Sequence, residues 1–167
     1  FFKHLIFIIL GIGIIFSFSA INQENLIKIS LAIFFLSILF LFLVPFFGVE
    51  VKGSKRWIDL YLLPRFQPVE LVKPFLIVFI SIILSSERYS NIYFKYLLSF
   101  LITIMIVLLL ALQPDIGQTL LILFTWSILI FMSGINIIFL SILFLLLIFS
   151  LTYLITFVPK FDYIKNR

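Results

Sequence analysis

Residues 48–74, GVEVKGSKRWIDLYLLPRFQPVELVKP, decide the fold of this chain. They gather charged side chains between two long apolar runs: Lys52, Lys55, Arg56, Arg65, Glu70 and Lys73. Charged residues kept beside membrane-embedded segments usually have a function. The stretch therefore predicts a loop between two membrane helices and, within that loop, a candidate functional site.

The composition around this stretch is that of a polytopic membrane protein. Hydrophobic residues make up 64% of the 167 residues and charged residues only 11%, a balance that excludes a soluble domain. Six apolar runs recur, most of them near the roughly 20 residues that cross a bilayer as a helix: 5–20, 29–47, 71–84, 96–112, 116–133 and 137–158. They lack the alternation of barrel strands. We therefore expect an all-α fold with six transmembrane helices in one transmembrane domain, 1–167.

Several classes of chemistry are excluded by the same composition. The chain has no cysteine, so disulfides and thiolate chemistry are excluded. Its net charge of +5 does not indicate nucleic acid as a partner, because the basic residues lie in short loops. No histidine or acidic cluster has metal-ligand spacing, so we expect no cofactor. The chain begins without methionine and ends just after an apolar run, and we expect it to be an internal piece of a longer protein.

Alternating spans place three polar segments on one side of the membrane: 48–66, 113–115 and 159–167. That side carries most of the lysine and arginine residues. Taken alone, the positive-inside rule would make it cytoplasmic.

Two expected helix starts on this side share a proline and an acid. Pro68 precedes Glu70 by two residues, and Pro114 directly precedes Asp115. Proline suits the first helical position, and a carboxylate in the first turn stabilises the helix. At Asp115, capping alone and a functional role are equally open.

The first of these starts carries more polar residues than capping requires. Lys73 lies on the same helix face as Glu70 by i,i+3 spacing, and Arg65 and Gln67 stand just before the helix. Helix N-termini attract anions, and arginine and lysine suit phosphate oxygens. The cluster predicts a site for a phosphorylated group carried by a lipid.

Three separated motifs resemble the SEDS family, named for shape, elongation, division and sporulation: KGSKRWIDL at 52–60, RFQPVELVK at 65–73 and QPDIG at 113–117. They occur in the family's order, and the chain is similar to roughly the second through seventh of the family's ten helices. GVEVKG at 48–53, together with Lys73-Pro74, favours the division branch, FtsW, over the elongation branch, RodA.

The resemblance implies a bacterial peptidoglycan glycosyltransferase that polymerises lipid II, the disaccharide-pentapeptide on undecaprenyl pyrophosphate, at the outer face of the cytoplasmic membrane. It implies a class B penicillin-binding protein and other divisome or elongasome membrane proteins as partners. It also places 48–66 and 113–115 outside, against the charge count.

Residue roles follow from the motif positions. The resemblance implies that Glu70, Lys73 and Asp115 contribute to catalysis, with Glu70 orienting Lys73. Residues expected to contact the substrate are Arg65, Gln67, Lys73, Lys55, Arg56, Trp57 and Gln113. For Arg56 and Trp57, interfacial anchoring is an equally open alternative. The family's presumed catalytic aspartate is expected beyond Arg167, so we expect this segment alone to be inactive.

Two other functions remain open. A lipid II flippase would use the same pyrophosphate site but would need a polar path through the membrane. A scaffold for a transpeptidase partner would tolerate neutral replacement of Arg65 and Lys73.

Overall fold

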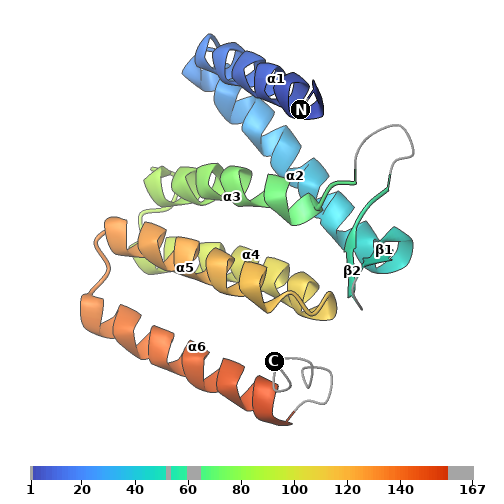
Figure 1. Cartoon of the computed structure of the whole chain (residues 1–167). Helices are drawn as coiled ribbons and strands as arrows, with labels where there is room; N and C mark the ends of the chain where they lie inside the picture. Colours follow the sequence, from blue (N-terminus) through green and yellow to red (C-terminus); the bar gives the residue numbers. More distant parts are fainter. Residues whose placement is uncertain (1, 52–53, 60–64, 158–167) are drawn as a thin grey trace.

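The computed structural model describes residues 2–51, 54–59 and 65–157. Within them the chain forms six helices and one short two-stranded sheet (Figure 1). In chain order these are α1 (Phe2–Ser19), α2 (Gln23–Phe47), β1 (Val49–Val51), β2 (Ser54–Trp57), α3 (Pro68–Ser85), α4 (Ile92–Leu112), α5 (Ile116–Met132) and α6 (Ile137–Phe157). Each helix covers one predicted apolar run, so the prediction of a mostly helical fold is confirmed.

By length and composition, α2, α3 and α4 can each cross a membrane, whereas α5 and the described part of α1 are shorter apolar helices. The chain is thus a multi-pass membrane protein in its described part, and the count of six transmembrane helices stays a prediction. Many apolar side chains of the helices, such as Leu108 and Phe124, are exposed. Such faces suit contact with lipid.

The first four helices begin earlier than their apolar runs, whereas α5 and α6 begin where predicted. α2 begins at Gln23 and α4 at Ile92, six and four residues before their predicted starts. At the start of α4, the Asn91 side chain accepts a hydrogen bond of 2.9 Å from the backbone N–H of Tyr93. This cap satisfies a donor that the helix itself cannot pair.

The predicted loop between α2 and α3 contains an antiparallel hairpin that the all-α prediction missed. Glu50 of β1 lies opposite Lys55 of β2, with a register irregularity beside Val49. An isolated bridge between Ile58 and Phe66 then leads the chain back to α3. Strands of three and four residues are too short to show a reliable alternation in sequence.

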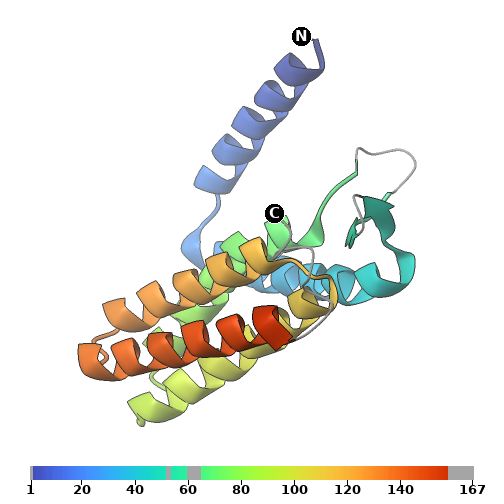
Figure 2. The ribbon, with the colours of Figure 1, turned by 60° about the horizontal axis from the view of Figure 1, so that its bottom comes forward.

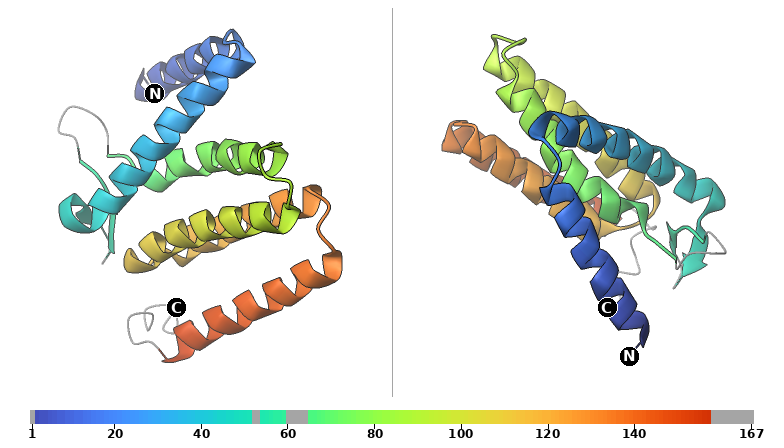
Figure 3. Two further views of the ribbon diagram at one scale, coloured as in Figure 1. Left: turned by 180° about the vertical axis from the view of Figure 1, so that it is seen from behind. Right: turned by 90° about the horizontal axis from the view of Figure 1, so that it is seen from above.

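The core forms where α2, α3, α4 and α5 pack together. α3 is central, and its Val69, Val72, Leu76 and Ile80 are almost completely buried. Seen from behind, α2 crosses α3, and α6 lies on the far side of α4 and α5 (Figure 3). α1 extends away from the other helices (Figure 2).

A polar seam joins α4 to α5. Ser99 and Thr103 of α4 are fully buried, and the indole N–H of Trp126 donates to the Ser99 hydroxyl oxygen at 3.1 Å. The Thr103 hydroxyl donates to the Ser99 carbonyl. Small polar residues of this kind let membrane helices approach closely, because every donor finds an acceptor inside the protein.

Truncation of the α3 core should destabilise the protein. Leu76→Ala should lower the free energy of unfolding by about 2–5 kcal/mol, because the cavity is enclosed on all sides. Ile77→Ala is the matched control, since this neighbour is 40% exposed and should cost no more than about 0.5 kcal/mol. Unfolding in detergent measures both, and equal losses would contradict the position of the core.

Candidate functional site

The carboxylate of Asp115 joins three segments at one end of the helix bundle. Asp115 is the N-cap of α5 and is 6% exposed. Its Oδ2 accepts a hydrogen bond of 2.9 Å from Nε2 of Gln67, which precedes α3. Its Oδ1 lies 3.5 Å from Nη1 of Arg56 in β2 and accepts from the Gln118 backbone N–H at 3.5 Å. Asp115 therefore caps a helix and also fixes the hairpin and the start of α3.

Arg56 uses the rest of its guanidinium on the turn between α4 and α5. Its Nη2 donates to the Pro114 carbonyl at 2.8 Å, and its Nε donates to the Gln113 carbonyl at 3.4 Å. Carbonyls at a helix C-terminus lack helical partners and carry partial negative charge. Arg56 is partly buried and joins β2 to this turn, whereas its neighbour Lys55 is exposed.

A second ion pair lies on the first turn of α3. Lys73 Nζ lies 2.7 Å from Oε2 of Glu70, as the i,i+3 spacing predicts. Glu70 Oε1 accepts a hydrogen bond of 3.0 Å from Nε2 of Gln118. Glu70 is half exposed, while Lys73 is 21% exposed. The pair holds the ammonium group in a defined place near the surface.

Gln118 links the two groups, and the sequence analysis missed it. Its backbone N–H reaches Asp115, and its side chain reaches Glu70. The signal was present, because glutamine three residues after a capping acid occupies the position that is favoured in capping boxes.

Gln113, a predicted substrate contact, lies inside the protein. Only 3% of it is exposed, and its Nε2 donates to the Leu41 carbonyl of α2 at 3.2 Å. Its backbone carbonyl accepts from Arg56.

Arg65 lies in a separate, more exposed pair. Its Nε lies 3.0 Å from Oδ2 of Asp59, with side-chain exposures of 55% and 37%. Trp57 in β2 is partly buried. The structure thus brings together Arg56, Gln67, Glu70, Lys73, Asp115 and Gln118, which we call the charged network, and it gives Arg65 a different partner.

The charged network is not a bare positive patch. Each of its two cations has a carboxylate partner, Arg56 with Asp115 and Lys73 with Glu70, and Arg65 has Asp59. The four charges of the network, two positive and two negative, therefore cancel. Substrate contact by any of these residues stays a prediction.

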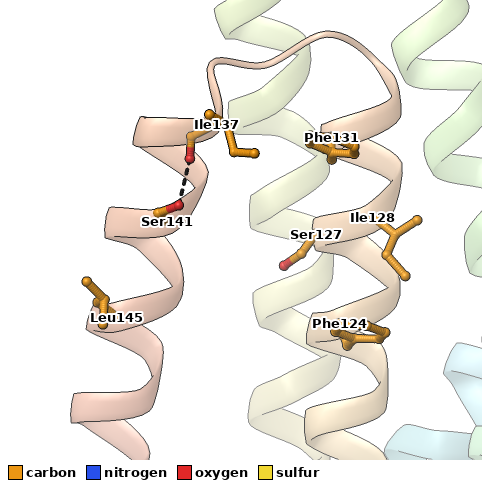
Figure 4. Close-up of a pocket in the computed structure, with 7 residues that line it drawn as sticks. All are labelled: Phe124, Ser127, Ile128, Phe131, Ile137, Ser141 and Leu145. Atoms are coloured by element: carbon orange, nitrogen blue, oxygen red, sulfur yellow. Dashed lines mark hydrogen bonds between the residues drawn. The ribbon is translucent and has the colours of Figure 1, made fainter.

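An apolar groove of about 540 Å³ lies elsewhere, between α5 and α6 (Figure 4). It is lined by Phe124, Ser127, Ile128, Phe131, Ile137, Ser141 and Leu145. The two serine hydroxyls donate to carbonyls of their own helices, Leu123 and Ile137. The groove therefore offers a hydrocarbon surface, and none of the charged network lines it.

Metal binding finds no support in the described ranges. No group of three or more histidine, aspartate or glutamate residues lies close enough there to hold an ion. The expected lack of a cofactor stays a prediction.

Replacing Arg56 should loosen the hairpin. In Arg56→Lys the ammonium cannot reach two carbonyls and a carboxylate together, so the free energy of unfolding should fall by about 1–3 kcal/mol. Lys55→Gln is the control, because the exposed Lys55 should contribute at most about 0.5 kcal/mol. Denaturation of both variants in detergent measures the difference. An Arg56→Lys protein as stable as the parent would contradict the contacts that we assign to the Arg56 guanidinium.

Comparison with known proteins gives concordant results. A family model described as "Cell cycle protein", FTSW_RODA_SPOVE, matches residues 1–167. A probable peptidoglycan glycosyltransferase FtsW of Haemophilus influenzae is 35% identical over 105 residues, which is 61% of this chain and 26% of the relative.

Solved structures agree with the fold. An alanine mutant of the rod shape determining protein RodA of Thermus thermophilus superposes with a TM-score of 0.68 at 32% identity, over 80% of this chain and 45% of RodA. A structure described as a peptidoglycan synthase complex that coordinates polymerization and crosslinking superposes with a TM-score of 0.64 at 29% identity, over 95% and 45% of the two chains. The chain spans about a quarter to two fifths of the curated relatives that it matches.

Proposed function

The chain belongs to the cell cycle protein family of FtsW, RodA and SpoVE. We therefore propose that its charged network forms part of the active site of a peptidoglycan glycosyltransferase. The complete protein would polymerise lipid II into glycan strands. The curated relatives named FtsW support the division branch. Since this chain spans under half of its relatives, the activity is proposed for the whole protein.

The charged network is the observation that carries this proposal. It joins the N-terminal ends of α3 and α5, where backbone N–H groups favour anions, to two cationic side chains, Arg56 and Lys73. During glycan transfer a sugar hydroxyl attacks the anomeric carbon while the bond to the pyrophosphate oxygen breaks. Negative charge then grows on the pyrophosphate, and cations held in place beforehand stabilise it.

Lys73 is the best placed of the cations for this role. It is partly exposed, so an incoming anion can reach it, and its short contact with Glu70 fixes its position. Glu70 then acts through Lys73, and Gln118 steadies Glu70. Positions fixed before the reaction need no reorganisation in the transition state.

Asp115 fits an organising role better than proton transfer. Both of its oxygens are engaged by donors, and the residue is almost buried. A general base must reach the proton that it abstracts. We therefore assign Asp115 to holding Arg56 and Gln67 in place.

The proposed arrangement places the hairpin and the charged network on the external side of the bacterial cytoplasmic membrane, where lipid II is polymerised. A class B penicillin-binding protein would crosslink the strands that this protein makes. The similarity to a chain of a peptidoglycan synthase complex that coordinates polymerization and crosslinking supports such a partner.

Polymerisation by the complete protein tests the proposal. Purified with a class B penicillin-binding protein and supplied with lipid II, the parent should make glycan strands. Lys73→Met should slow this by about 10²–10³-fold, because it removes charge stabilisation in the transition state. Lys95→Met is the matched control, since the Lys95 ammonium bonds the Leu84 carbonyl at the other end of α3, and it should keep most of the activity.

Two outcomes would overturn the proposal. A folded parent that moves lipid II across vesicles without making polymer would be a flippase. A folded parent that neither makes polymer nor moves lipid II would be a scaffold. A folded Lys73→Met that makes strands as fast as the parent would overturn the role proposed for Lys73.

A further inference from the structure

α2 contains a break in its backbone hydrogen bonding. Pro45 lies inside this helix and has no N–H, so the carbonyl of Leu41, four residues earlier, loses its helical donor. Leu41 is fully buried, and water cannot replace that donor in a membrane core. An unpaired carbonyl there is costly.

The side chain of Gln113 supplies the missing donor. Its Nε2 donates to the Leu41 carbonyl at 3.2 Å across a separation of 72 residues. The residue belongs to the turn between α4 and α5, whose carbonyls at Gln113 and Pro114 receive the guanidinium of Arg56. The next residue along is Asp115, the centre of the charged network.

We infer that Gln113 is a positioning residue that docks the turn carrying Asp115 onto the carbonyl freed by Pro45 in α2. Its side chain fixes the turn to α2, and its backbone fixes Arg56 to the turn. The proline defect in one helix thereby sets the place of the charged network on another.

Burial separates this role from direct substrate contact. Gln113 is 97% buried, and its Oε1 is enclosed with no partner among the residues that the structure describes. A substrate would have to displace α2 to reach the amide. The effect of Gln113 on catalysis rests on the proposed function, whereas its coupling to Pro45 does not.

A double-mutant cycle in the complete protein tests the coupling. Gln113→Leu leaves the Leu41 carbonyl unpaired and should lower Tm by roughly 3–10 °C. Pro45→Ala restores a backbone N–H at position 45, which can bond that carbonyl. In the Pro45→Ala background, Gln113→Leu should therefore lower Tm by less than half as much as it does in the parent. An equal loss of Tm in both backgrounds would overturn the inference.

Gln118→Leu is the matched control for the cycle. Gln118 is also a glutamine of the site, but it bonds Glu70 instead of α2. The loss of Tm caused by Gln118→Leu should be the same with and without Pro45→Ala. If Pro45→Ala also reduced the loss of Tm caused by Gln118→Leu, the effect would belong to α2 as a whole. The specific pairing of Gln113 with the Leu41 carbonyl would then be overturned.

Hydrogen exchange decides the question if Pro45→Ala fails to fold. In Gln113→Leu the amides of Gln118 and Thr119, which bond Asp115, should exchange at least about tenfold faster than in the parent. The Tyr93 amide, capped by Asn91 at the other end of α4, should not change. Unchanged exchange at Gln118 and Thr119 would overturn the inference.

Polymerisation separates positioning from substrate contact. If Gln113 only positions the turn, Pro45→Ala should restore much of the kcat that Gln113→Leu loses, with KM little changed. If stability returns but kcat does not, Gln113 touches the substrate and the positioning role is wrong. The Tm and exchange results stand even for a protein that makes no polymer.

Discussion

The pairing of Asp115 with Arg56 and Gln67 constrains everything around it. A nearly buried carboxylate is costly unless donors surround it, and its donors here come from β2, from the residue before α3 and from α5 itself. Gln67 lies 48 residues before Asp115 in the sequence, and β2 lies earlier still. Asp115 therefore joins the segments at this end of the bundle, and Arg56 adds a bond to the Pro114 carbonyl that ties the short hairpin to the turn before α5.

The need to satisfy polar groups inside hydrocarbon shapes the rest of the chain. Hydroxyls of α4 and α5 bond backbone carbonyls, and Trp126 finds Ser99 across the interface. Where Pro45 interrupts α2, a side chain from a distant turn repairs the defect. The same rule links the helix core to the charged network, because the side chain of Gln113 donates to α2 and its backbone carbonyl accepts from Arg56.

Sequence reasoning located the helices because apolar length is a strong signal, and it placed Glu70 beside Lys73 because helical spacing is local. It missed the hairpin, whose strands are too short to show a period. It also gave Arg65 to the anion cluster, although its partner is Asp59. The contacts of Asp115 and Gln113 cross 48 to 72 residues, and distances of that kind depend on how helices pack, which no local pattern encodes.

The ion pairs also bear on which anions the proposed site would bind. A carboxylate anchored beside Arg56 or Lys73 is present at high effective concentration, so a dissolved competitor must offer more than a single charge. Chloride brings one charge and no directed oxygens, so we expect it to lose this competition at the proposed site. A diphosphate brings several charges and many acceptors on one ligand, and it can replace more than one internal contact at once. The proposed site is electrically neutral at rest, and we therefore expect it to ignore the common salts of its surroundings.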